Sequence, residues 1–110
     1  MTRQIEDRGA LEAALESPRF LLFKHSRVCP VSSRAFTRYE EFVRDNPDVQ
    51  TGWIDVIGQR QWSQWVAAEY GVEHKSPQVL LFQNGQVVWH QSHREITPDS
   101  LADALAPRNP

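Results

Sequence analysis

The dipeptide Asn84-Gly85 sets the strongest limit on how this chain can fold, because it separates two apolar segments. Asn and Gly tolerate the positive φ angles of a tight two-residue turn, so the dipeptide predicts a β-hairpin between residues 79–82 and 87–89. The strands of a hairpin pair antiparallel. Any sheet that contains this hairpin therefore has at least one antiparallel pair.

The rest of the chain alternates predicted helices with apolar strands. Residues 20–23 form an unbroken apolar run, typical of a central strand covered on both faces, and residues 53–57 predict a second buried strand. Apolar residues at helical spacing predict helices over residues 7–16, 30–45, 61–70 and 98–105. Strand–helix–strand segments favour parallel pairing, so we expect an α/β protein with a mixed four-stranded sheet and helices on both faces. A chain of 110 residues has the size of one domain, and we expect residues 1–110 to form it.

The composition excludes several classes of function. A formal net charge of −2 gives no general attraction to nucleic acid or to an anionic membrane. No apolar run approaches the ~20 residues of a transmembrane helix, and the first residues lack the apolar segment of a signal peptide. The single cysteine cannot form an intrachain disulfide. We therefore expect a cytoplasmic protein with neither nucleic acid nor membrane as a partner.

Cys29 stands between the first apolar strand and the predicted helix that begins at Pro30. Proline is favoured at the first helical position, because its missing N–H would have no partner there. The sulfur then lies near free N–H groups and the positive end of the helix dipole, which stabilise the thiolate, the attacking form of cysteine. Lys24, His25 and Arg27 add positive charge nearby, and we expect Lys24 and Arg27 to be solvated. The sequence predicts a reactive Cys29; the alternative is a small, inert, buried residue.

Three further positions are candidates for the same site. Ser32 lies one helical turn after Cys29, where its hydroxyl is placed to hydrogen-bond the sulfur. His25 titrates near neutrality and fits a partner or proton shuttle for the thiolate, the alternative being a half-exposed histidine at a strand end. Ser76-Pro77 precedes a predicted strand, where proline is tolerated. Because most X–Pro bonds in folded proteins are trans, the residues alone predict a trans bond here.

Short strings in a fixed order between residues 19 and 105 carry a family resemblance. They are Phe23-Lys24-His25-Ser26, Cys29-Pro30-Val31-Ser32, Ile54-Asp55-Val56-Ile57, His74-Lys75-Ser76-Pro77-Gln78-Val79-Leu80-Leu81, Asn84-Gly85, Val88-Trp89-His90, Ser92-His93 and Ile96-Thr97. Together they closely resemble the YtxJ-type monothiol bacilliredoxins, bacterial proteins linked to the small thiol bacillithiol. One position departs from the family pattern, because Val28 stands where the family is expected to have threonine.

The resemblance implies a thioredoxin-like fold and a thiol–disulfide oxidoreductase. Such a protein would remove bacillithiol from S-thiolated client proteins through a mixed disulfide on Cys29. The resemblance further implies that Pro77 follows a cis bond and faces Cys29, with Ser76 offering backbone groups to an extended substrate. Ser32 occupies the place of the second cysteine of dithiol relatives, so turnover needs an external thiol. The implied catalytic set is Cys29, Pro30, Ser32 and Pro77.

The expected co-substrate is bacillithiol or another low-molecular-weight thiol. We expect it to bind in a groove between the loop that carries Cys29 (the cysteine loop), Ser76-Pro77 and the turn from His90 to Arg94. The candidate binding residues are His25, Ser76 and His93, with His90 and Arg94 as further candidates. The alternative for His90, His93 and Arg94 is a solvated turn without a ligand. We expect no bound metal, because the histidines lack ligand spacing and no Cys-x-x-Cys occurs, although an iron–sulfur cluster bridged by Cys29 between two chains stays open. Two other functions also stay open: a redox-inactive binding module, and a sensor that only becomes S-thiolated.

Overall fold

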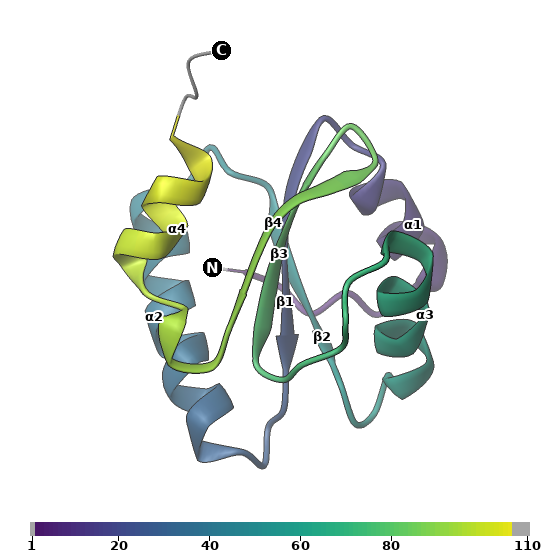
Figure 1. Cartoon of the computed structure of the whole chain (residues 1–110), viewed down its shortest axis with the longest axis horizontal. Helices are drawn as coiled ribbons and strands as arrows, with labels where there is room; N and C mark the ends of the chain where they lie inside the picture. The colour runs from purple at the N-terminus through teal and green to yellow at the C-terminus, as the bar shows by residue number, and fades with distance from the viewer. Residues whose placement is uncertain (1, 107–110) are drawn as a thin grey trace.

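A four-stranded sheet lies between two layers of helices in the computed structural model, which describes residues 2–106 (Figure 1). The elements are α1 (Arg8–Leu15), β1 (Arg19–His25), α2 (Pro30–Asp45), β2 (Thr51–Asp55), α3 (Arg60–Tyr70), β3 (Gln78–Gln83), β4 (Gln86–Ser92), the short 3-10 helix η1 (His93–Glu95) and α4 (Pro98–Leu105). Apart from η1, this is the predicted order of helices and strands. The α/β class is therefore confirmed.

The sheet is mixed, as the hairpin requires. Its strand order is β2-β1-β3-β4, with β1 parallel to β2 and antiparallel to β3, and with β3 antiparallel to β4. Asn84 and Gly85 have φ angles of 52° and 79° and form the predicted turn. Helices α2 and α4 cover one face of the sheet, and α1 and α3 cover the other (Figure 1). The central strand β1 is consequently buried on both sides.

Strand β2 begins and ends two residues earlier than predicted. The apolar run predicts a strand over residues 53–57, whereas β2 covers Thr51–Asp55. Its parallel partner β1 ends at His25, which pairs with Asp55, so the ladder has no further residues to continue on. The chain then turns, and the Asp55 carboxylate accepts a hydrogen bond from the Ile57 N–H (2.9 Å). Ile57 is 59% exposed rather than buried.

Helix α2 is fixed to the sheet by one buried tyrosine. The Tyr39 hydroxyl lies 3.2 Å from the carbonyl oxygens of Leu21 and Gly52, which belong to neighbouring strands. Its ring packs against Phe23 with a centroid distance of 4.9 Å, and Phe23 also contacts Phe36. Burial of an apolar side chain of this size contributes roughly 1.5–3 kcal/mol. The helix that follows Cys29 therefore rests on a rigid base.

Four segments, of which only the first two are consecutive in sequence, meet at one end of the molecule, the lower end in Figure 1. They are the loop after β1, the start of α2, the start of β3 and the turn between β4 and α4. The hairpin turn lies at the opposite end. Within residues 2–106, each helix is too short or too polar to cross a bilayer. Because the four segments meet at the lower end, the predicted site residues are expected there.

Candidate active site

Cys29 is the N-cap residue of α2, with extended backbone angles of φ −102° and ψ 119°, and Pro30 is the first helical residue. The Cys29 N–H donates to the Ser26 carbonyl (3.3 Å), and the Cys29 carbonyl accepts from the Ser33 N–H (3.0 Å). The side chain makes no capping hydrogen bond, and the residue is partly exposed. The backbone therefore holds the sulfur at the positive end of a helix, where a reactant can reach it.

The Ser32 hydroxyl is expected from the sequence to hydrogen-bond the Cys29 sulfur, but its hydrogen-bond partners are other groups. It accepts a hydrogen bond from the Ser26 N–H (2.9 Å) and lies 2.7 Å from His25 Nδ1. Ser32 is fully buried. The hydroxyl consequently ties the start of the cysteine loop to the first turn of α2, so that Ser32 positions the loop that carries Cys29.

His25 is buried, so the alternative of a half-exposed ring is wrong. The imidazole stacks on Phe36 with a centroid distance of 4.4 Å and an interplanar angle of 10°. Burial lowers the pKa of His25; the Asp55 carboxylate opposes this effect and the Arg27 charge adds to it. The ring is therefore neutral at pH 7 and supports the cysteine loop through Ser32.

Lys24 lies on the other face of the sheet, so the prediction of a solvated lysine that adds charge beside the cysteine is wrong. Successive side chains of a strand alternate between faces, and Lys24 points toward α3. It is fully buried, with Nζ donating to the Ser63 carbonyl (3.0 Å) and lying 3.3 Å from His74 Nδ1. Burial lowers the pKa of Lys24 to about 8. Arg27 is exposed as predicted, with Nε 3.9 Å from the Asp55 carboxylate.

Replacement of Lys24 by methionine is expected to remove a pH-dependent part of the free energy of unfolding. Between pH 8 and 10.5 the folded Lys24 loses its proton before the unfolded one, so the unfolded chain binds more protons and stability rises with pH. Between pH 7 and pH 9.5 the rise is about 2 kcal/mol, at 1.36 kcal/mol per pKa unit. Urea unfolding at the two pH values measures it. Equal rises in the unmodified chain and in Lys24→Met would contradict this origin.

The Ser76–Pro77 peptide bond is cis, as the family resemblance implies and contrary to the trans bond that the residues alone predict. Pro77 is buried directly before β3, whose first residue, Gln78, pairs with Lys24 near the end of β1. Continuing this register places Pro77 beside His25, at the lower end of the sheet. Ser76 is partly exposed, and its buried Oγ has no hydrogen-bond partner within residues 2–106.

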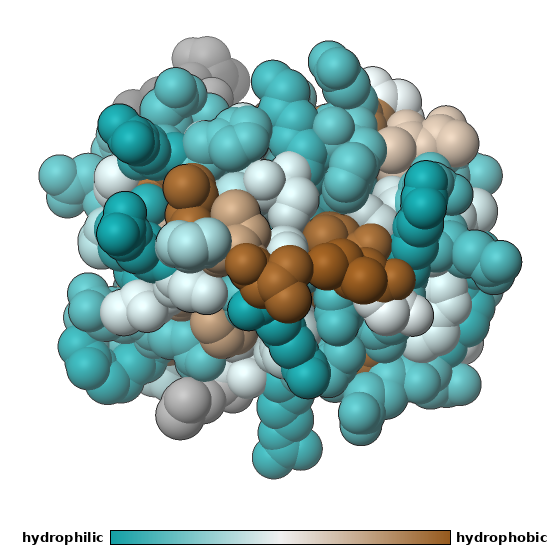
Figure 2. All heavy atoms as spheres, turned by 90° about the horizontal axis from the view of Figure 1, so that it is seen from below, coloured by the Kyte–Doolittle hydropathy of each residue, from teal (hydrophilic) through white to brown (hydrophobic). Residues whose placement is uncertain are grey.

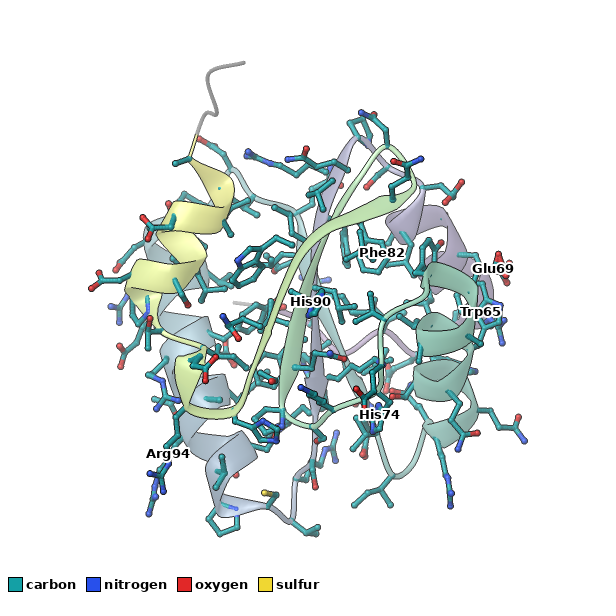
Figure 3. The ribbon with its side chains drawn as sticks, viewed as in Figure 1. Trp65, Glu69, His74, Phe82, His90 and Arg94 are labelled. Carbon is teal, nitrogen blue, oxygen red and sulfur yellow. The ribbon has the colours of Figure 1, made fainter. Side chains whose placement is uncertain are left out.

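The candidate residues of β4 and η1 are divided between the lower end and the middle of the sheet. His93 is exposed with a φ of 56°, and its N–H donates to the Pro77 carbonyl (3.1 Å), which brings His93 to the site. His90 pairs with Leu80 farther along β4, and Figure 3 shows it over the middle of the sheet. Arg94 lies beside the lower part of α2 (Figure 3). The structure therefore brings His93 and Arg94 to the lower end but leaves His90 outside.

A pocket of about 330 Å³ adjoins the first turns of α2. It is lined by Val31, Arg34, Arg38, Arg94 and Thr97. Arg34 and Arg38 are not among the candidates that the sequence provides. The signal that could have found them is their i,i+4 spacing on the helix that follows Cys29.

Two apolar side chains are exposed beside the cysteine loop. Val28 is 79% exposed and directly precedes Cys29, while Ile57 is 59% exposed and follows β2. Because β1 and β2 are parallel, the loops that leave them share one edge of the sheet. Figure 2, which looks at this end, shows hydrophobic side chains gathered near the middle of the face and hydrophilic ones around them. In residues 2–106, no cluster of three or more His, Cys, Asp or Glu side chains could hold a metal ion.

Comparisons with known proteins agree on fold and family. A family model described as monothiol bacilliredoxin BrxC matches residues 3–101. A solved structure described as a candidate oxidoreductase with a thioredoxin fold is 30% identical, with a TM-score of 0.85, and the match covers 94% of this chain and 91% of the other.

Thioredoxins from two parasites show the same fold at low identity. The Trypanosoma brucei brucei protein is 10% identical, with a TM-score of 0.77 and coverage of 96% of this chain and 88% of the other. The Plasmodium falciparum protein is 12% identical, with a TM-score of 0.73 and coverage of 94% of both chains. The fold is therefore thioredoxin-like, and the family supports a thiol redox role with thiols and proteins as substrates. Since the family model spans residues 3–101, the chain belongs to the monothiol bacilliredoxins of the BrxC type.

Proposed function

We propose that this protein removes bacillithiol from S-thiolated proteins by thiol–disulfide exchange at Cys29. The observation that carries the proposal is the placement of Cys29, the only cysteine of the chain, as the partly exposed N-cap of α2. A thiolate is favoured at a helix N-terminus, and the thiolate is the nucleophile of disulfide exchange. A reducing cytoplasm, where such a thiol stays free, is the compartment that we propose.

The first step transfers the small thiol from the client to Cys29. The Cys29 thiolate attacks the bacillithiol sulfur of the client's mixed disulfide, and a new disulfide forms between Cys29 and bacillithiol. The old disulfide breaks, and the client cysteine leaves as a thiolate that takes a proton from water. Cys29 is oxidised and the client is reduced, so the electrons balance without a further reactant.

The second step regenerates Cys29 and requires a co-substrate. A second bacillithiol, or another low-molecular-weight thiol, attacks the bacillithiol sulfur attached to Cys29. A small-molecule disulfide leaves, and Cys29 returns to the thiolate. Residue 32 is serine, which cannot form a disulfide, so the chain has no internal group to perform this step.

The other proposed site residues hold the sulfur and the client in place. Pro30 begins the helix, and Ser32 braces the cysteine loop against His25. Ser76 and His93 flank Pro77, where we propose that an extended client segment meets backbone groups; the His93 N–H itself is bonded to the Pro77 carbonyl. We further propose that apolar client side chains contact the exposed Val28 and Ile57, because both lie beside the cysteine loop.

Intact-mass spectrometry tests the proposal directly. The reduced protein is mixed with a bacillithiolated client, and the masses of both are followed with time. We expect the protein to gain the mass of one bacillithiol while the client loses it, and added bacillithiol should then restore the original mass. If Cys29 takes up bacillithiol from a small-molecule disulfide but never from a client, the protein is a sensor. Without any uptake, it is a binding module of the same fold.

A further inference from the structure

We propose that the pocket lined by Arg34, Arg38 and Arg94 binds the carboxylates of the small thiol during exchange at Cys29. The inference rests on the proposed function and deepens it, because it names the part of the co-substrate that the protein recognises. It assigns to these arginines a role that neither the cysteine nor the cis-proline can supply.

The pocket carries positive charge that the protein itself does not neutralise. Three arginines, Arg34, Arg38 and Arg94, are among the residues that line a space of about 330 Å³, so their guanidinium groups lie on or near its rim. In residues 2–106, the arginines that lie within 4.0 Å of a carboxylate are others, namely Arg8, Arg27 and Arg44. Guanidinium groups stay charged at all relevant pH values. A concave surface with several unpaired charges of one sign attracts an anion, and arginine binds carboxylates through paired hydrogen bonds.

The arginines come from two elements that are fixed relative to each other. Arg38 Nε donates to the Ile96 carbonyl (2.6 Å), which joins α2 to the segment after η1. Arg94 belongs to η1, whose first residue, His93, donates its N–H to the Pro77 carbonyl. The two elements that carry the arginines are therefore held together before a ligand binds, so that binding has to order only the exposed side chains of Arg34 and Arg94.

The pocket lies within reach of a molecule attached to Cys29. Val31, two residues after Cys29, lines it. From Cys29 to Arg34 the helix rises about 7.5 Å, at 1.5 Å per residue. This rise is only the axial part of the separation, because five residues also turn the helix by about 140°. The long arginine side chain leans back toward the helix N-terminus, which shortens the gap that a small thiol with a remote acidic end has to span. With its sulfur on Cys29, such a thiol passes Val31 and places its carboxylates among the arginines.

A binding measurement tests the pocket without the redox step. The probe is S-methyl bacillithiol, which cannot exchange, titrated into the full chain and followed by NMR. We expect a Kd about tenfold weaker for Arg34→Gln and for Arg94→Gln than for the unmodified chain. Arg44→Gln, an exposed arginine farther along α2, is the matched control and should bind as the unmodified chain does. The fully esterified probe, in which every carboxylate is a methyl ester, should bind all four proteins equally weakly.

A transfer measurement then connects the pocket to exchange. One client peptide is prepared with bacillithiol and, separately, with the neutral thiol 2-mercaptoethanol on the same cysteine. The unmodified chain should take bacillithiol about tenfold faster. Arg94→Gln should lose this preference, with the rate for 2-mercaptoethanol changed less than twofold. Arg38 is left unchanged, because its bond to Ile96 supports the fold.

The outcomes separate the pocket from the proposed function. If the ester binds as well as the acid, or if Arg34→Gln and Arg94→Gln bind as tightly as the unmodified chain, the carboxylate pocket is refuted. Equal slowing of both peptides by Arg94→Gln would assign the pocket to the client instead and would also refute it. Carboxylate-dependent binding without any transfer would support the pocket and refute the exchange activity.

Discussion

Replacement of Cys29 by serine is expected to abolish bacillithiol transfer completely while the fold is retained. A hydroxyl oxygen cannot form the mixed disulfide, and no other sulfur in residues 2–106 can replace it. Serine is a favoured N-cap residue, whereas the Cys29 side chain makes no capping bond, so Cys29→Ser should be at least as stable as the unmodified chain. Intact-mass analysis with a bacillithiolated client measures transfer, and thermal unfolding measures stability.

The two measurements together exclude the explanation that transfer is lost because the protein unfolds. A folded Cys29→Ser protein without an adduct locates the chemistry at this sulfur. If Cys29→Ser still freed the client cysteine at the original rate, release would not proceed through Cys29 and the proposed mechanism would be wrong.

Conversion of Ser32 to cysteine is expected to change a one-thiol site into a two-thiol site. The new sulfur would stand one helical turn after Cys29, in the place from which a Cys-x-x-Cys motif resolves its own mixed disulfide. Bacillithiol taken up by Cys29 should then leave as the free thiol, and the protein should lose the mass of two hydrogens. In the mass spectrum, the adduct that dominates for the unmodified chain should become a minor species.

Ser32→Ala separates this chemistry from the loss of the serine itself. Alanine leaves the buried Ser26 N–H and His25 Nδ1 without their shared partner, which costs about 1–3 kcal/mol for an unsatisfied buried group. We therefore expect Ser32→Ala to unfold at lower urea concentration and to accumulate the adduct as before. A persistent adduct in Ser32→Cys would show that the two sulfurs do not reach disulfide geometry.

The fold was largely predictable because its signals are local. The Asn84-Gly85 turn and the proline after Cys29 each act through the conformation of one or two residues. The end of β2 was not predictable in this way. Val56 and Ile57 are as apolar as a strand requires, but β1, their hydrogen-bonding partner across the sheet, ends opposite Asp55.

The site was predictable at Cys29 and less so around it. The burial of Lys24 depends on Ser63 and His74, which lie 39 and 50 residues further along the chain. Because these partners are so distant in sequence, no pattern of residues around Lys24 indicates that it is buried. Arg34 likewise resembles any solvated helix residue until η1 places Arg94 against the same helix. The sequence gives the number of charged residues, whereas tertiary contacts decide where each charged side chain lies.

The hydrogen bond from the Ser26 N–H to the Ser32 hydroxyl closes residues 26–32 into a ring that contains Cys29. Such a closure reduces the number of conformations open to the loop, so much of the adjustment during approach falls to the molecule that carries the disulfide. We therefore expect modified cysteines on mobile client segments to be repaired sooner than those set deep in rigid surfaces. The order in which clients recover would then follow their own local flexibility.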